Sequence, residues 1–233
     1  SYVAAADVVR TLTVIAPPLL TWDFAGTAGD QVSSISTSNS SNIASSTITR
    51  GAGLTAGANA DRFNASTWAA TSIANAVTGN DYMEFTVAPN SGYQFAVSSI
   101  LFNIQRSGTG LRGIALRSSV DGYASNLDSE KAVIDNTSTQ IFTFTFAQAS
   151  TTSPVTYRLY GYAESTGGSG GFEGTGNDIV VTGTQSSNVN FREIEIIETQ
   201  AAGPPQPPIA NFYAPDTVWI NSPYDLVSTS TSS

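Results

Sequence analysis

The sequence contains no cysteine and no histidine among its 233 residues. Without cysteine there is neither a disulfide framework nor a thiolate metal site, and without histidine the commonest general base and zinc ligand is missing. The sequence therefore excludes hydrolases that use a serine–histidine or cysteine–histidine mechanism, and it excludes zinc hydrolases.

Charge is also scarce, because only 12% of the residues are charged, whereas ~25% is usual for soluble domains. Nine basic residues stand against 18 acidic ones, which gives a net charge of −9, and the basic residues do not cluster. Nucleic acids bind to concentrated positive charge, so we expect no nucleic-acid partner. No run approaches the ~20 apolar residues of a membrane-spanning helix, so we expect no membrane insertion.

The sequence is instead rich in serine, threonine, glycine, alanine and asparagine, while 40% of its residues are hydrophobic. That hydrophobic content is enough to build one sizeable core, with hydroxyl and amide groups covering the surface. A lysine-poor, hydroxyl-rich surface favours a secreted or cell-surface location. No basic segment followed by an apolar one opens the sequence, so we expect it to be a mature or excised portion of an exported protein.

Short segments of alternating apolar and polar residues, separated by turns rich in glycine, proline and asparagine, predict β-strands along most of the chain. The alternation changes phase at Ser98 and Ser99, which predicts a bulge. Residues 69–77 are the best candidate for a short helix. Together these patterns predict an all-β fold: a two-sheet antiparallel β-sandwich, jelly-roll-like. The strands expected with most support are 20–24, 82–87, 93–106, 112–119, 141–146, 156–162 and 177–183.

The pattern divides the chain into four parts. Residues 1–18 are expected to be an N-terminal connector or pairing strand that stops at two prolines, and residues 19–186 the jelly-roll β-sandwich. Residues 187–208 hold a further alternating strand and a stiff, proline-rich linker. Residues 209–233 are too few for a domain, and we interpret them as the incomplete start of one.

Several motifs, taken in order, resemble a jelly-roll module of secreted and outer-surface proteins of Bacteroidota. They span about residues 20–184, and the resemblance implies a β-sandwich that often occurs in tandem with other β modules. The motifs are Thr21-Trp22-Asp23-Phe24, Thr49 to Leu54, Tyr82 to Val87, Ile104 to Gly110, Leu116 to Tyr123, Tyr157 to Tyr162 and Asp178 to Gly183.

The end of the chain resembles a second family. Pro208 to Phe212 and Val227 to Thr231 are similar to the opening of a PKD-type immunoglobulin-like domain. The two resemblances together imply a chain that continues beyond Ser233 in a large adhesin, gliding filament or type IX secretion cargo. The resemblance also implies glycosylation at Thr217, since Asp216-Thr217-Val218 matches the short pattern that such bacteria O-glycosylate.

Glycan binding commonly uses an exposed aromatic ring surrounded by amide and guanidinium groups. The alternative is that the tryptophan belongs to the core and the tyrosines cover a sheet face, and we favour that alternative. The candidate ligand-binding residues are Trp68, Arg106, Arg112, Arg117, Tyr123, Tyr160 and Tyr162.

Structural calcium is a second candidate, because calcium prefers oxygen ligands and Asp23 and Asp178 fall in the strands expected to open and close the sandwich. A turn-stabilising role is the favoured alternative for each. Glycoside hydrolysis needs two paired carboxylates, and no such pairing is recognisable, so we expect no catalytic residue and no enzyme activity.

Three functions remain open from the sequence. The first is a non-catalytic module of a large secreted surface protein, used for adhesion or assembly with other copies or other domains of that protein. The second is a carbohydrate-binding module of a secreted multi-domain hydrolase. The third is a fibre subunit in which residues 10–16 and 191–198 pair with neighbouring molecules.

Overall fold

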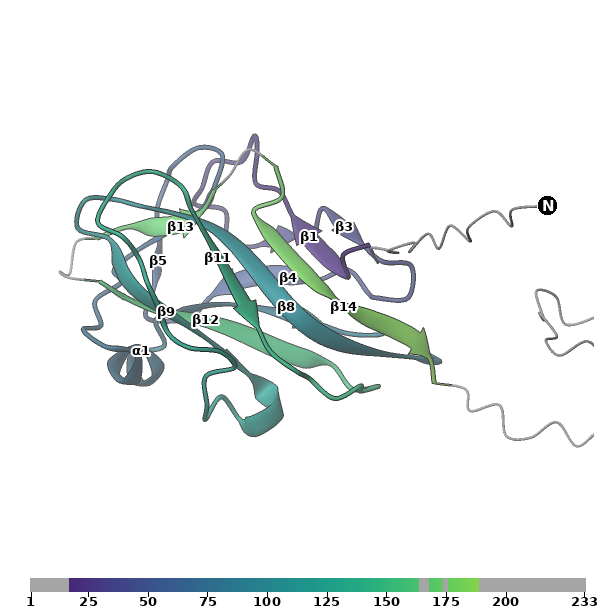
Figure 1. Ribbon diagram of the computed structural model, residues 1–233. Helices are drawn as coiled ribbons and strands as arrows, with labels where there is room; N and C mark the ends of the chain where they lie inside the picture. The colour runs from purple at the N-terminus through teal and green to yellow at the C-terminus, as the bar shows by residue number, and fades with distance from the viewer. Residues whose placement is uncertain (1–16, 164–167, 174–175, 189–233) are drawn as a thin grey trace, which may run out of the picture. The chain divides into compact units, whose positions relative to one another are not determined.

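The computed structural model describes residues 17–163, 168–173 and 176–188 (Figure 1). The chain divides into two units, residues 1–190 and 191–233, and everything described belongs to the first. The predicted pairing segments 10–16 and 191–198, the proline-rich linker, the immunoglobulin-like start and Thr217 lie outside the described residues, so these remain predictions.

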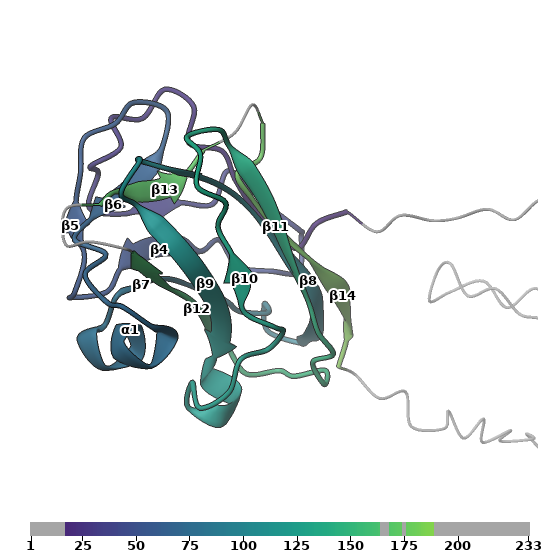
Figure 2. The same cartoon turned by 60° about the vertical axis from the view of Figure 1, so that its left-hand side comes forward.

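The described chain folds into two facing β-sheets, and all of the strand pairs in it are antiparallel (Figures 1 and 2). This confirms the predicted all-β sandwich. The larger sheet has the order β3-β1-β14-β8-β13-β6-β5, with β11 also paired to β8, and the smaller has the order β10-β9-β12-β7-β4-β2. The larger sheet consists of β1 (Leu20–Trp22), β3 (Ser38–Asn39), β5 (Thr55–Ala56), β6 (Phe63–Ser66), β8 (Tyr93–Arg106), β11 (Gln140–Thr145), β13 (Gly170–Phe172) and β14 (Ile179–Ser187). The smaller sheet consists of β2 (Ser34–Ile35), β4 (Thr47–Arg50), β7 (Tyr82–Val87), β9 (Leu111–Ser118), β10 (Lys131–Ala132) and β12 (Val155–Ala163).

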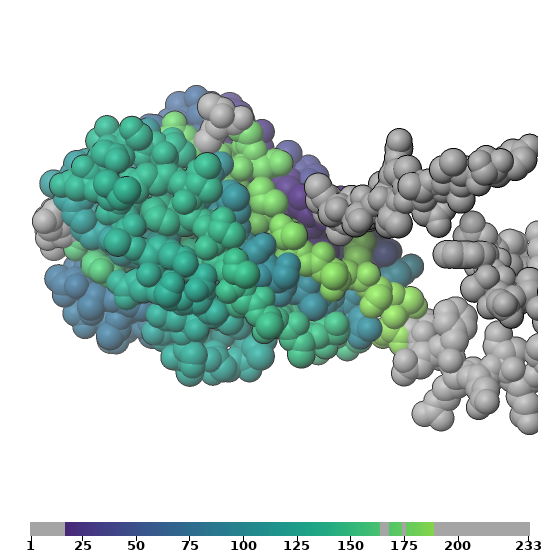
Figure 3. Space-filling view, in the orientation of Figure 1, coloured from purple at the N-terminus to yellow at the C-terminus, as the bar shows by residue number. Residues whose placement is uncertain are grey.

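The longer strands alternate between the sheets in the manner of a jelly roll. The chain passes from β7 in the smaller sheet to β8 in the larger, then to β9, β11, β12 and β14 in turn. The opening strand β1 pairs with the closing strand β14, with Trp22 opposite Ile179. The two ends of the sandwich therefore meet in one sheet. The side chains of β8, β11 and β14, coloured teal to green, pack side by side on the outside of this sheet (Figure 3).

Aromatic side chains from both sheets form the core between them. Trp22 of the larger sheet meets Phe85 of the smaller, with ring centroids 4.9 Å apart. Phe102 contacts both Phe144 and Phe172, at 6.0 and 5.4 Å between centroids. All five rings are almost completely buried. Full burial of one such side chain contributes ~1.5–3 kcal/mol, so this layer is the main source of stability.

One short helix, α1 (Ile73–Gly79), packs on the outside of the smaller sheet (Figure 2). It begins four residues later than predicted because the Ser72 side chain caps it by accepting the Asn75 N–H. It ends at Asn80, which has left-handed backbone angles. A single 3-10 turn, η1 (Ser119–Asp121), follows β9. No helix in the described chain is long and apolar enough to cross a membrane.

Two positions, Ser98 of β8 and Gly171 of β13, show how single residues shape the larger sheet. The predicted bulge is confirmed, because the register with β14 skips Ser98. β13, which contains Gly170 and Gly171, is not among the strands expected from the sequence. A Cβ on Gly171 would lie 2.5 Å from the Phe63 carbonyl oxygen, so glycine is what lets this strand approach β6.

The lateral edges of the two sheets are bridged by hydrogen bonds. On one side the Ser36 N–H donates to the Ser46 carbonyl, and the next residue, Thr37, donates across to β1. On the other side the Gln140 side chain accepts the Ile134 N–H at 2.8 Å and donates to the Ile134 carbonyl at 3.0 Å. These bonds use backbone groups that an open sheet would present to a partner strand.

Candidate binding site

The outer face of the smaller sheet carries two rows of side chains from neighbouring strands. In the first row Arg158 of β12 lies between Glu84 of β7 and Arg117 of β9. In the second row Tyr160 of β12 lies opposite Tyr82 of β7. Odd-numbered neighbours on β12 point the other way and enter the core between the sheets. The alternation of β12 therefore collects an arginine and tyrosines on the outside.

Arg158 is the centre of this arrangement. Its Nε donates to Glu84 Oε2 at 2.8 Å, and its Nη1 lies 3.4 Å from the Tyr160 hydroxyl. Its guanidinium carbon lies 4.1 Å from the centre of the Tyr82 ring and 3.9 Å from the centre of the Tyr123 ring. A guanidinium plane favours aromatic faces, and each such contact contributes ~0.5–1 kcal/mol at a partly exposed site. The group is therefore held in one position.

Tyr123 reaches Arg158 from the loop that follows η1. Its backbone φ of 64° is in the left-handed region, which costs a residue other than glycine ~1–2 kcal/mol. The conformation is held by the Tyr123 N–H, which donates to the Ser118 carbonyl, and by Arg117 Nη1, which donates to the Tyr123 carbonyl at 2.9 Å. The Asp121 carboxylate accepts two backbone N–H groups further along the loop. Arg117 thus serves to hold the loop that carries Tyr123.

Tyr162 extends the cluster along β12. Its hydroxyl donates to Glu130 Oε1 at 2.9 Å, and this bond is the main cause that raises the pKa of Tyr162. The hydroxyl therefore remains a donor. Tyr160 differs, because its ring packs at 5.3 Å on the edge of Tyr82 and is only 1% exposed. Tyr123 and Tyr162 are the partly exposed tyrosines of this group.

We call this group the tyrosine–arginine face. The structure brings together four of the seven predicted ligand-binding residues, and it adds Arg158, Tyr82 and Glu84, which the prediction did not include. The signal for Arg158 was available, because it stands two residues before Tyr160 on an alternating strand. The face comprises Tyr82, Glu84, Arg117, Tyr123, Arg158, Tyr160 and Tyr162.

Arg106 and Arg112 do not join this face. Both guanidinium groups contact Asp135 Oδ1, at 2.5 Å and 2.8 Å, and the Arg106 side chain is completely buried. Hydrogen bonds from Arg112 first, and then from Arg106, lower the pKa of Asp135. The two arginines tie the segment after β10 to the sandwich.

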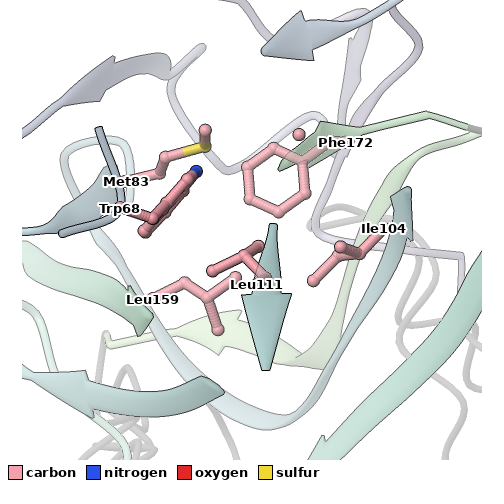
Figure 4. Close-up of a pocket in the computed structure, with 7 residues that line it drawn as sticks. Trp68, Met83, Ile104, Leu111, Leu159 and Phe172 are labelled. Carbon is pink, nitrogen blue, oxygen red and sulfur yellow. The ribbon is translucent and has the colours of Figure 1, made fainter. Parts of the chain in front are cut away.

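Trp68 does not join this face either, because it is 1% exposed and lies in the core. Its indole N–H donates to the Gly170 carbonyl at 3.2 Å. Its ring borders a cavity of about 10 Å³, with Met83 and Phe172 pointing into the same space (Figure 4). An apolar void of that size holds no ligand. The alternative reading of Trp68 as a core residue is the one that the structure supports.

Asp23 and Asp178 lie next to the paired residues Trp22 and Ile179, so they are neighbours at one end of β1 and β14. Asp178 is 1% exposed, and its Oδ2 accepts the Phe24 N–H at 2.9 Å. Burial, and secondarily the charges of Asp23 and Glu173, raise the pKa of Asp178 to about 6, although the Phe24 bond opposes the shift. In the described part of the chain, no three His, Cys, Asp or Glu side chains form a metal-holding group.

The chain matches no protein-family model, no curated protein and no solved structure. The role of the tyrosine–arginine face is therefore argued from its chemistry. The partly exposed rings of Tyr123 and Tyr162 offer apolar area with a hydroxyl at the tip, while the guanidinium and carboxylate groups of the face offer hydrogen bonds in fixed directions.

Proposed function

We propose that this chain is a non-catalytic module of a large secreted or cell-surface protein, and that it serves in adhesion or extracellular assembly through the tyrosine–arginine face. The observation that carries the proposal is the position of Arg158 between the rings of Tyr82 and Tyr123. A side chain held in this way pays little conformational entropy when a ligand binds.

The placement of charge supports a binding role for the face. Arg158 and Arg117 are directly opposite each other on neighbouring strands, and like charges in that register destabilise a sheet. Only nine basic residues occur in the whole chain. Two of them thus form a like-charge pair on this face, and a local conflict of this kind is typical of residues kept for function.

Several acids of the described chain support a non-catalytic role. Glu84, Asp128, Asp135 and Glu173 form ion pairs with arginine or lysine. Asp178 has the raised pKa expected of a general acid, but its side chain is buried and a general acid must reach its substrate. Together with the lack of histidine and cysteine, this favours binding over catalysis.

The sequence supports the proposed place of this module in a larger exported protein. A surface of hydroxyl and amide groups, and the resemblance to Bacteroidota surface modules followed by a PKD-type domain, favour a multi-domain exported protein. In such a protein the sandwich acts as one of several modules that contact a surface or neighbouring domains.

A second candidate, the carbohydrate-binding module of a secreted hydrolase, is favoured by one specific observation. The Tyr123 ring is fixed by Arg158, while Tyr162 of β12 donates a hydrogen bond to Glu130 at 2.9 Å. A fixed ring suits the apolar face of a sugar, and the surrounding polar groups suit its hydroxyls. The two candidates share the face and differ in the ligand.

A comparison of binding partners tests both candidates. The full chain is applied to a glycan array, to insoluble polysaccharides and to cell or matrix surfaces, alongside Tyr123→Ala, Arg158→Ala and the control Tyr93→Ala, whose tyrosine begins β8 in the other sheet. Adhesion predicts retention on surfaces, whereas a carbohydrate-binding module predicts retention on polysaccharide. In either case Tyr123→Ala and Arg158→Ala should lose binding and Tyr93→Ala should keep it. A chain that binds none of these surfaces contradicts the proposal.

A further inference from the structure

Two buried oxygen atoms lack a hydrogen-bond donor at the end of the larger sheet where β13 and β14 separate. They are Oδ1 of Asp178 and Oδ1 of Asn103, which have no hydrogen-bond partner although each atom is shielded from solvent. The Asn103 amide is oriented by its Nδ2, which donates to the Asn177 carbonyl at 3.1 Å. The direction of its oxygen is therefore set by the structure.

The two residues are held next to each other by the backbone. The Asn103 N–H donates to the Asp178 carbonyl at 2.8 Å, and the Asn103 carbonyl accepts the Glu173 N–H at 3.0 Å. Asn103 thus bridges the end of β13 and the start of β14. Asp23 approaches from the opposite side, because it follows Trp22, whose partner Ile179 follows Asp178.

The charges at this position are unbalanced. Asp23 and Glu173 both act electrostatically on Asp178, and both are negative. The cation nearby is Arg62, whose Nη2 lies 2.9 Å from Glu173 Oε2 and so neutralises that carboxylate. Within the described residues, neither Asp178 nor Asp23 forms an ion pair. A buried carboxylate oxygen without a donor, beside a second carboxylate, costs free energy unless the group is protonated or a cation is bound there.

We propose that a hard divalent cation, calcium in the first place, binds between Asp178, Asn103 and Asp23. Calcium takes carboxylate, amide and water oxygens together, so two carboxylates and one amide oxygen are a sufficient protein contribution when water completes the shell. The ion ties β1 to β14 and β8, which are the strands that open, close and cross the larger sheet. This structural role is independent of the tyrosine–arginine face.

Thermal unfolding of the full 233-residue chain tests the proposal. The chain is stripped with a chelator and then melted at pH 7.5 with CaCl₂ or with NaCl of equal ionic strength. Because a ligand that binds only the folded state stabilises it, saturating calcium should raise Tm by about 5–10 °C, whereas NaCl should not. Calorimetric titration of the unaltered chain with CaCl₂ should show binding at one site.

The matched variants are Asp178→Asn and Asp30→Asn. The first removes the charge but keeps an oxygen for the Phe24 N–H, and the second removes an exposed acid from the loop that follows β1. Calcium should raise Tm for Asp30→Asn and not for Asp178→Asn. If Asp178→Asn does not fold, Asp23→Asn takes its place.

Two results overturn the proposal: no calcium binding by calorimetry in the unaltered chain, or an undiminished Tm shift in the folded Asp178 or Asp23 variant. Calcium should raise the Tm of Tyr123→Ala as much as that of the unaltered chain, because the Tyr123 side chain contacts Arg158 of the smaller sheet. Failure of the calcium site and failure of the proposed adhesion function are thus separately visible.

Discussion

The guanidinium carbon of Arg158 lies 3.9 Å from the centre of the Tyr123 ring, which joins a central strand of the smaller sheet to the loop after β9. The same carbon lies 4.1 Å from the centre of the Tyr82 ring. The contact with Tyr123 fixes a partly exposed ring on the sheet face where Arg158 and Arg117 lie opposite each other. The binding proposal and the first prediction both depend on it.

Arg158→Lys should loosen the Tyr123 loop while leaving the sandwich folded. Lysine keeps the charge beside Glu84 but cannot stack a planar group between two rings. We expect a loss of about 1 kcal/mol in the free energy of unfolding and faster hydrogen exchange in residues 119–126. Urea unfolding and amide exchange measure the two effects. Unchanged exchange in the loop would show that the stack does not position Tyr123.

Gly161→Ala should destabilise the core, and Gly108→Ala is the matched control. A Cβ on Gly161 would lie 2.5 Å from Leu111 Cδ2 and 2.9 Å from the Trp68 ring, whereas one on Gly108 meets nothing within 4 Å. Overpacking of this kind costs about 1–3 kcal/mol. Chemical denaturation should show that loss for Gly161→Ala and almost none for the control. Equal stabilities would contradict the packing around Trp68.

Asp128 should make stability fall in acid. A bond from the Thr145 N–H is the main cause that lowers its pKa to about 2, followed by the Lys131 ammonium. The ionised form stabilises the fold, so this contribution is complete above about pH 4 and disappears as the pH falls towards 2. Asp128→Asn should therefore be less stable than the unaltered chain at pH 5, with the difference closing near pH 2. A difference that does not depend on pH would refute this assignment.

When divalent cations are chelated, Asp178 should make the stability of the fold decrease as the pH rises, which is opposite to the effect of Asp128. Its pKa of about 6 is above the ordinary value, because of burial and of the charges of Asp23 and Glu173. Its contribution to stability is then complete below about pH 4 and declines as the pH rises through 6. In chelator, Asp178→Asn should flatten the stability profile between pH 4 and 7. A profile identical to that of the unaltered chain would contradict the shifted pKa.

The strands were predictable where apolar residues alternate. Both β7 and β8 have the predicted bounds, and even the phase change at Ser98 was visible, because the pattern follows directly from which side chains face the core. In contrast β13 was missed, since Gly170 and Gly171 have no side chains to show a pattern. Its place depends on contacts with β6 and β8 that are distant in the sequence.

The candidate site was only partly predictable for the same reason. The places of Asp23 and Asp178 in the opening and closing strands were predictable, whereas the pairing of those two strands is seen only in the structure. The burial of Arg106 did not follow, because it depends on Asp135, which arrives from a loop. The stack on Arg158 was not predictable either, because it depends on the position of Tyr123. That position depends on the left-handed backbone conformation of Tyr123 itself.

The most direct test of the account is the affinity of the unaltered chain, Tyr123→Ala and Tyr93→Ala for the ligand or surface that the unaltered chain retains. The account predicts that Tyr123→Ala, with its fold verified by thermal unfolding, weakens binding at least tenfold, which corresponds to about 1.4 kcal/mol. Tyr93→Ala should bind as the unaltered chain does. Equal affinity of Tyr123→Ala and the unaltered chain would contradict a binding role for the tyrosine–arginine face.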